Sequence, residues 1–395
     1  MVLLLLPDGW DLCGGIMQIK EVLDKKDMRI FARIPERLHG GRLCYVPPIW
    51  LEERRLYTKE GNPILRNSDF TLLIVINDKQ TAVGRIIPYI DHKYNEYYKA
   101  KTGFFGAFEC EDDPEAGSML VRAAEEWLCE RGMEHIRGPI NPVAENWGLL
   151  LYGYEKPPMY MSPWNPEYYH KFFTGSGYSK AKDLLAYDAD IKSGYRLPER
   201  YENFPGIFQA RYPEINLRRL DLKNIKRDAV SIWEIANMSL KDNWGYVPLE
   251  LSVMEDMLKK LRLIVDPNSV WIVENAGKAV GFCLGYPDIN IIIKQINGRL
   301  LPFGWLKLIA GSKKLRDYRL FGLAVHPEWK GRGLDSLMYI NLYRYLYAGQ
   351  THMEANYILE DNMSIKNALE KLGMKLSKIY RIYEKPLKDK NNAVS

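Results

Sequence analysis

The sequence predicts a mixed α/β (α+β) protein built from two similar halves. Three observations support this prediction. The composition, 47% hydrophobic and 27% charged over 395 residues, is that of an ordinary globular chain. Segments with helical i, i+3, i+4 apolar spacing alternate with short β-rich segments, which excludes an all-α or an all-β fold. A long-period internal repeat indicates that one fold occurs twice.

The repeat is clearest in two segments that have the pattern of a β-hairpin. Residues 75–91 (VINDKQTAVGRIIPYID) align with residues 272–288 (IVENAGKAVGFCLGYPD), and Ala, Val, Gly, Tyr and Asp recur in register. Each segment has an apolar strand, a polar turn and a second strand. Two further pairs match in the same order: Phe104-Phe105-Gly106 with Leu320-Phe321-Gly322, and Gly177-Tyr178 with Gly373-Met374.

Two domains joined by a linker are therefore expected. The first covers residues 17–191 and the second residues 212–387, with the Gly-, Pro- and charge-rich segment 192–211 between them. In each half we expect the order helix, helix, hairpin, strand, helix, strand, helix, strand, which gives a mixed, mostly antiparallel sheet flanked by helices. Residues 1–16 are expected to be a non-native or disordered extension, and residues 388–395 a disordered tail.

Charge and cysteine content narrow the function classes. A net charge of +5 without a run of five like charges disfavours nucleic acid as a partner. The apolar runs are far shorter than the ~18 residues that span a bilayer, so no membrane span is expected. The five cysteines are far apart and form no CxxC pair, which argues against a disulfide framework or a metal site and favours a reducing cytoplasm.

The second half contains one long insertion, residues 289–312, between its hairpin and the next strand. The favoured interpretation is a helix that packs its apolar face on the sheet or on the other half. The functional alternatives are a lid over a substrate and an interfacial helix on a membrane surface.

The most informative segment for function is residues 320–335 (LFGLAVHPEWKGRGLD). An apolar strand ends before Pro327, and a Gly-rich turn then opens an amphipathic helix. The unpaired N–H groups and the dipole of a helix N-terminus attract anions such as a pyrophosphate. The glycines allow close approach of the backbone, and Lys330 and Arg332 add positive charge. The spacing matches neither a nucleotide P-loop nor a dinucleotide-binding turn.

This segment resembles the acyl-CoA binding core of the GNAT (Gcn5-related) N-acetyltransferase superfamily. The family pattern Gln/Arg-x-x-Gly-x-Gly/Ala falls on Lys330, Gly333 and Asp335, and the likeness covers about residues 270–385. It implies two tandem GNAT-like domains and acetyl-CoA or another acyl-CoA as cofactor. By this resemblance the strand residues Leu323 and Val325 would bind pantetheine, and the pyrophosphate would be held by Lys330, Gly331, Arg332, Gly333, Leu334 and Asp335, with Asn362 beside the cofactor.

The first half matches this pattern in layout only. Residues 109–117 (ECEDDPEAG) replace the Gly-rich turn with five acidic residues, which would repel a pyrophosphate, so this copy is expected to bind no CoA. The second half also departs from the family at two positions. Asp335 stands where Gly or Ala is preferred, and Leu369 stands where many relatives have a Tyr that protonates the leaving thiolate.

The residues that transfer protons are less clearly marked. The strand 319–325 contains no Glu of the kind that often serves as base in the family. Glu360 and Tyr383 are the catalytic candidates, and Asp361, His326 and Tyr380 were considered beside them. Helix capping, solvation and packing are competing structural roles for all five.

An acceptor site is expected in the loop 243–248, where a GNAT half presents its substrate loop. Trp244 and Tyr246 are the candidate substrate residues, and the structural alternative is that Trp244 plugs the interface between the halves.

The preferred function is that of a cytoplasmic N-acyltransferase, which transfers an acyl group, expected to be acetyl, from CoA to the primary amine of a small molecule or peptide by direct attack. Two alternatives stay open. One is a Fem-like aminoacyl or peptidyl transferase that would use tRNA. The other is a non-catalytic ligand-binding protein on a decayed GNAT fold.

Overall fold

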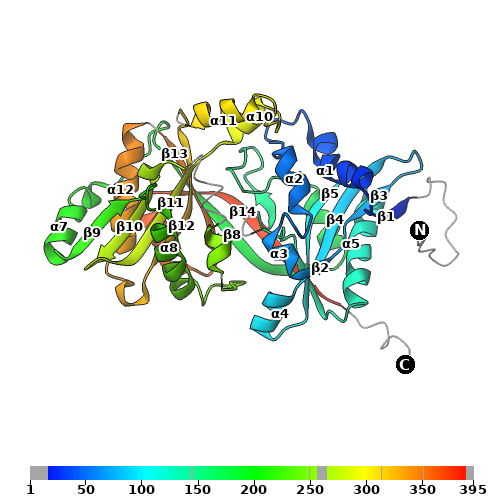
Figure 1. Ribbon diagram of the computed structural model, residues 1–395, viewed down its shortest axis with the longest axis horizontal. Helices are drawn as coiled ribbons and strands as arrows, with labels where there is room; N and C mark the ends of the chain where they lie inside the picture. The colour runs from blue at the N-terminus through cyan, green and yellow to red at the C-terminus, as the bar shows by residue number, and fades with distance from the viewer. Residues whose placement is uncertain are drawn as a thin grey trace.

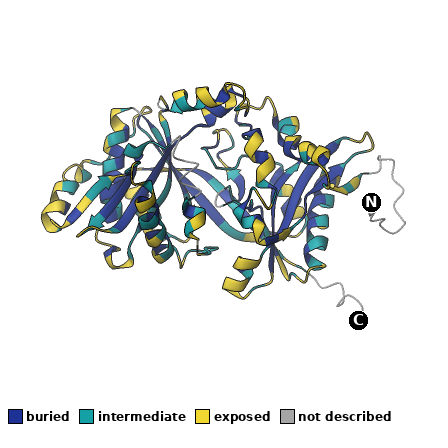
Figure 2. Cartoon of the chain, in the orientation of Figure 1, coloured by how far each residue is buried: buried dark blue, intermediate teal, exposed yellow. Residues whose placement is uncertain are grey.

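The strands of the described residues form one continuous sheet of 14 strands, with helices packed against it (Figure 1). The computed structural model describes residues 17–143, 146–248, 250–255, 265–312, 314–349 and 351–387. The expected extension 1–16 and tail 388–395 lie outside the described residues. The strands consist mostly of buried residues, whereas exposed residues lie on helices and loops (Figure 2).

The first half starts with a short strand and three helices, followed by the strands and helices of a mixed sheet. Its elements are β1 (Gln18–Glu21), α1 (Lys25–His39), α2 (Trp50–Leu56), α3 (Pro63–Arg66), β2 (Ser68–Phe70), β3 (Leu73–Ile76), β4 (Ala82–Asp91), α4 (His92–Tyr98), β5 (Thr102–Cys110), α5 (Pro114–Cys129), β6 (His135–Gly138), β7 (Leu149–Tyr152), α6 (Tyr169–Gly175) and β8 (Ser179–Asp190).

The second half repeats this layout with the insertion added. Its elements are η1 (Glu199–Tyr201), α7 (Phe204–Arg211), β9 (Ile215–Arg219), α8 (Ile225–Ser239), η2 (Pro267–Ser269), β10 (Val270–Asn275), β11 (Lys278–Pro287), α10 (Asn290–Gln295), α11 (Gly304–Ser312), β12 (Asp317–Val325), η3 (Pro327–Trp329), α12 (Leu334–Ala348), β13 (His352–Leu359), α13 (Met363–Lys371) and β14 (Lys375–Pro386).

Both predicted hairpins are confirmed, because β3 pairs antiparallel with β4 and β10 with β11. The insertion is helical, as expected, and contains α10 and α11. The predicted opening of each domain with two helices is wrong, since the first elements within residues 17–191 and 212–387 are the strands β1 and β9, and η1 and α7 lie in the predicted linker 192–211. These two strands form the two edges of the sheet; β1 is largely exposed, whereas β9 is mixed in its burial. Short, polar edge strands lack the alternation of apolar residues that marks a strand in sequence.

The two halves exchange their last strands. Strand β14 of the second half lies between β6 and β8 of the first half, and β8 in turn pairs with β13 of the second half. In Figure 1 the red β14 runs beside the green β8 through the middle of the molecule. Each half therefore completes its sheet with a strand from the other, and separating the halves would break both ladders.

Two strand pairs of the sheet are parallel, β5 with β6 and β12 with β13. The register of β12 with β13 ends at Leu320↔Ala355, although β12 continues to Val325 and β13 to Leu359. The two strands therefore diverge at their carboxyl ends. The register of β5 with β6 also ends early, at Phe104↔Arg137, but the chain after β6 stays bonded to β5, because the Ile140 N–H donates to the Phe105 carbonyl at 2.7 Å. The opening between strands that contains a cavity is the one beside β12.

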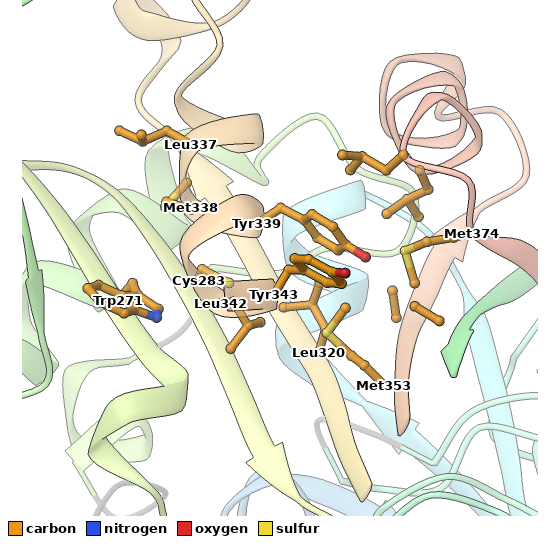
Figure 3. Close-up of a cluster of buried hydrophobic side chains, with 14 of the residues drawn as sticks. Trp271, Cys283, Leu320, Leu337, Met338, Tyr339, Leu342, Tyr343, Met353 and Met374 are labelled. Carbon is orange, nitrogen blue, oxygen red and sulfur yellow. The ribbon is translucent and has the colours of Figure 1, made fainter. Parts of the chain in front are cut away.

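Helices α8 and α12 cover opposite faces of the second half. Cys283 packs in the same cluster as Leu337 and Met338 of α12 (Figure 3). Its neighbours on β11, Phe282 and Leu284, belong to the cluster that includes α8. Successive side chains on a strand point to opposite faces, so this alternation fixes one helix on each side. Helix α12 is thereby held beside the opening between β12 and β13.

A histidine links the exchanged strands. His352 on β13 lies 2.7 Å from the Asp188 carboxylate on β8 and 3.5 Å from that of Asp317. Burial alone would lower the pKa of His352, but its hydrogen bonds to Asp188 and Asp317 outweigh burial and raise the pKa from 6.5 to about 10. The charged imidazole therefore stabilises the fold fully below pH 6.5, and this stabilisation is lost as the pH rises through about 10.

We therefore expect His352→Gln to lower the free energy of unfolding at pH 6, with a deficit that shrinks as the pH rises from 6.5 to about 10. Urea unfolding across that pH range measures the difference. His92→Gln is the matched control, because His92 pairs with Asp69 where both side chains are more than half exposed. A deficit that does not change with pH would contradict the assigned role of the charged imidazole.

Candidate functional site

Two cavities adjoin where β12 leaves β13. The smaller, of about 210 Å³, lies in the opening between the two strands. The larger, of about 980 Å³, extends from there into the first half. Four residues line both cavities: Leu240, Phe282, Phe321 and Gly322. The middle of β12 is therefore the boundary at which contents of the two cavities would meet.

The backbone of β12 is directed into the smaller opening at alternate residues. The N–H of His326 donates to the Val280 carbonyl on β11, so the backbone groups of Ala324 and Gly322 also face β11. Those of Leu323 and Val325 consequently point away from β11, toward the opening. Leu323 lines the smaller cavity, whereas Val325 does not, and the Val325 carbonyl accepts a hydrogen bond from the Ser239 hydroxyl at 2.8 Å.

The N-terminus of α12 faces the same cavity without a side-chain cap. Its cap residue is Gly333, which has φ of 90° and no side chain that could accept a hydrogen bond. The first N–H groups of a helix have no acceptor within it, so those of Leu334, Asp335 and Ser336 are available. Asp335 and Ser336 line the smaller cavity. A Cβ at Gly333 would also lie 2.8 Å from the Phe204 ring of α7, so glycine is required here for space as well as for conformation.

The rest of the predicted turn lies farther from this cavity. Lys330, Gly331 and Arg332 are exposed and line neither cavity, and the Arg332 guanidinium lies over the Trp329 ring at 4.9 Å. The Leu334 side chain is fully buried in the cluster beneath α12. Leu334 could therefore serve a ligand only through its backbone N–H.

The equivalent helix of the first half is capped. The Asp113 carboxylate accepts hydrogen bonds from the N–H groups of Glu115 at 2.9 Å and Ala116 at 3.2 Å, at the start of α5. An anion at this helix N-terminus would have to compete with a resident carboxylate. The two halves thus share their layout but differ in what the helix N-terminus can bind.

Asn362 and Leu369 both line the smaller cavity. The Asn362 side chain caps α13 by accepting a hydrogen bond from the Ile365 N–H at 3.2 Å. Leu369 is buried and closes the cavity with an apolar surface at the position where many GNAT proteins have a Tyr.

The two catalytic candidates lie outside both cavities. The Glu360 carboxylate accepts from Lys180 Nζ at 2.8 Å and from the Asp183 N–H at 3.1 Å. Tyr383 is buried in the core of the first half and stacks on Phe173. Burial raises the pKa of the Tyr383 hydroxyl. These contacts fit structural roles for both residues.

Trp244 and Tyr246 both line the larger cavity. The Arg137 guanidinium lies 5.1 Å from the Trp244 ring centroid, and the Tyr246 hydroxyl donates to the Asn237 side chain. The loop that follows α8 therefore contacts both halves, since Arg137 belongs to β6.

The larger cavity is lined mainly by apolar side chains, among them Ile232, Met254, Phe282, Leu284, Ile293 and Ile309. Several charged groups in its wall have polar partners. Arg85 donates to Glu53 at 3.0 Å, and Glu109 accepts from the Tyr169 hydroxyl at 2.7 Å. Paired charges leave the cavity suited to an apolar ligand.

A buried polar network beneath the junction of the cavities was not predicted. Asn356 lines the smaller cavity and donates to Glu354 at 2.6 Å and to the Ser162 hydroxyl at 3.1 Å, and Ser162 lines the larger cavity. Glu354 also accepts from Lys378 at 2.5 Å, and Asn356 accepts from Arg319. One sequence signal could have indicated this network, namely the charged residues within otherwise apolar strands. A charged side chain on a buried strand needs a buried partner of opposite charge or a hydrogen-bond partner.

The described residues contain no group of three or more His, Cys, Asp or Glu side chains that could hold a metal ion. No helix in the described part of the chain has the length and hydropathy needed to span a bilayer.

We expect Lys378→Met to lower the free energy of unfolding by about 3–5 kcal/mol, because Glu354 would remain buried without a countercharge. The double variant Lys378→Met/Glu354→Leu removes both charges and should regain part of that loss. Guanidinium unfolding compares the variants. Lys101→Met, which breaks an exposed pair with Glu134, is the control and should leave the free energy of unfolding nearly unchanged. A double variant less stable than the single one would contradict the pairing argument.

Comparison with known proteins agrees with the tandem GNAT fold. No family model matches the chain. The chain is 30% identical over 392 residues to the bacterial ceramide synthase of Caulobacter vibrioides, covering 96% of this chain and 100% of that protein. It is 29% identical over 380 residues to protein YghO of Escherichia coli, covering 93% and 95%.

Among solved structures, a tandem GNAT protein from the clavulanic acid biosynthesis pathway matches with a TM-score of 0.56 at 10% identity, over 94% of this chain and 99% of that one. The predicted fold is thereby confirmed. This chain, with its two GNAT-like halves, belongs to the family of the bacterial ceramide synthase of Caulobacter vibrioides.

Proposed function

We propose that the protein is an acyl-CoA-dependent N-acyltransferase that acylates the amino group of a long-chain amine. The observation that carries this proposal is the junction of the two cavities at Phe321 and Gly322. At these two residues of β12, the smaller cavity, which has available backbone groups, adjoins the large apolar cavity. A thioester entering from one side could react there with an apolar amine held on the other.

The smaller opening has the groups that a CoA thioester needs. The uncapped N–H groups of Leu334, Asp335 and Ser336 suit its pyrophosphate, and the backbone of Leu323 suits its pantetheine arm. The exposed Lys330 and Arg332 would add positive charge at the entrance. The CoA thioester supplies the activated acyl group.

Size and apolarity favour long-chain substrates over acetyl and small polar amines. A volume of about 980 Å³ is at the upper end of the range for ligand pockets, and an acetyl group would leave it nearly empty. The relative from Caulobacter vibrioides is named for ceramide, which is the fatty amide of a long-chain amino alcohol. We therefore infer an amino alcohol acceptor and a fatty acyl chain for this protein. The active site would face a reducing cytoplasm, in keeping with the separate, free thiols of Cys44, Cys110 and Cys283.

The chain contributes alignment and hydrogen bonding at the junction. Ser162 and Asn356 bridge the two cavities through their hydrogen bond and form a polar patch in an otherwise apolar wall. This patch would orient the amino and hydroxyl groups of the acceptor, with Glu354 fixing the Asn356 amide from behind. Holding a neutral amine close to the thioester supplies most of what acyl transfer requires.

Ser336→Glu should raise the dissociation constant for CoA at least about tenfold, because it places a carboxylate at the helix N-terminus that would bind the pyrophosphate. The helix itself tolerates an acid in its first turn. Asp335→Asn should tighten CoA binding by removing a like charge. Isothermal titration calorimetry measures both variants, and Ser118→Glu in α5 is the matched control. Unchanged binding by Ser336→Glu would remove the proposed cofactor site.

Gly322→Leu should abolish amide formation from a long-chain acyl-CoA and a long-chain amino alcohol, whereas Gly322→Ala should retain it. A Cβ at Gly322 would make ordinary contacts with Phe282 and Leu284 at 3.5 and 3.6 Å, so only the larger side chain fills the junction. Mass spectrometry of the amide product gives the readout. Turnover of acetyl-CoA with a small polar amine, and none with the long-chain pair, would overturn the assigned substrate class.

A further inference from the structure

The insertion exposes an unusual concentration of large apolar side chains. Of the 17 exposed large apolar side chains among the described residues, five lie between residues 291 and 306. These five are Ile291, Leu301, Phe303, Trp305 and Leu306, with exposures of 45–73%. Scattered exposed apolar residues need no explanation, but a cluster of this kind marks an interaction surface.

Helix α11 has two apolar faces. Trp305, Leu308 and Ile309 line the larger cavity and follow the i, i+3, i+4 spacing of one helix face. Leu306 of the same helix is exposed, and so is Phe303, which immediately precedes the helix. Trp305, although 45% exposed, is part of the cavity wall, so the outer apolar surface is continuous with the cavity lining.

The exposed surface continues onto the first half. Lys294 donates to the Leu43 carbonyl, and the Trp50 N–H donates to the Gly298 carbonyl at 3.1 Å. Leu43 is 85% exposed and Leu51, next to Trp50, is 50% exposed. In Figure 1, α10 and α11 lie along one edge of the molecule, between the bulk of the second half and helices α1 and α2.

All charged residues of this segment are basic. Residues 289–316 contain six basic residues and no acidic residue, whereas the whole chain has a net charge of only +5. Lys294, Arg299, Lys307, Lys314 and Arg316 are all exposed. Exposed aromatic and aliphatic side chains among basic residues are typical of segments that lie in the headgroup region of an anionic membrane.

We propose that the α10–α11 segment docks the protein on the surface of an anionic lipid bilayer. Phe303, Leu306, Leu301 and Ile291 would enter the headgroup region, and the basic side chains would contact lipid phosphates. Docking in this orientation would bring the wall formed by Trp305, Leu308 and Ile309 to the bilayer, so that a long-chain substrate could pass into the larger cavity without crossing water. The value of this route rests on the proposed function, whereas the binding itself does not.

Co-sedimentation of the full chain with vesicles tests the proposal, with no acyl-CoA or amine present. The vesicles contain phosphatidylcholine alone or with phosphatidylglycerol as one lipid in three. The protein should bind the anionic vesicles, and binding should weaken as salt concentration rises. Phe303→Glu/Leu306→Glu should lower the partition coefficient at least about tenfold. The control is Leu23→Glu/Ile207→Glu, which replaces two exposed apolar side chains elsewhere and lowers the net charge by the same amount. It should bind like the native chain.

Equal vesicle binding by the native chain and Phe303→Glu/Leu306→Glu, or no binding by the native chain, would overturn the proposal. A native dimer that the same variant converts to monomers, without vesicle binding, would show that a second copy covers this face and would also overturn it. Because the assay needs no substrate, vesicle binding in a protein without acyltransferase activity would reject the proposed function alone. Thermal unfolding of both double variants verifies that they are folded.

Discussion

The exchange of β8 and β14 is the constraint on which the rest of the structure depends. It joins the two halves through continuous ladders and places Lys378 of β14 and Glu354 of β13 on either side of β8, where they meet in a buried ion pair. Ala186 of β8, opposite Lys378 and fully buried, has too small a side chain to separate them. Such a pair contributes little net free energy relative to an apolar core, but each partner makes the other indispensable. The angle between the halves is fixed as a result, and so are the cavities that both halves line.

The two halves place equivalent strands and helices in different surroundings. In the second half, β12 and β13 diverge beside an uncapped helix N-terminus, which suits an anionic ligand. In the first half, Asp113 caps the corresponding helix, and residues that follow the paired part of β5 and β6 line the larger cavity. One copy has an uncapped helix N-terminus, and the other contributes part of the wall of the larger cavity.

The apolar cavity and the exposed insertion form a single arrangement. Helix α11 faces the cavity with one side and the surroundings with the other, and residues 289–316 include basic but no acidic residues. A long-chain amine is poorly soluble in water, so an enzyme acting on it gains from a contact surface that leads directly to the reaction site. The buried polar patch of Ser162 and Asn356 then marks the point at which the polar end of such a molecule would stop.

Residue patterns alone predict the duplicated α/β layout, both hairpins, the helical insertion and the Gly-rich opening of α12. These features depend on local periodicity and on backbone demands such as the positive φ of Gly333, which leave a direct trace in residue type. The three-dimensional fold was needed to show that the last strands are exchanged, since strand pairing between distant segments has no local signature. It also decided that Arg319, Glu354 and Lys378 are buried together, and that Glu360 pairs with Lys180 away from both cavities. Contacts between residues far apart in the chain depend on how sheets close and helices pack, and no spacing within a single segment specifies them.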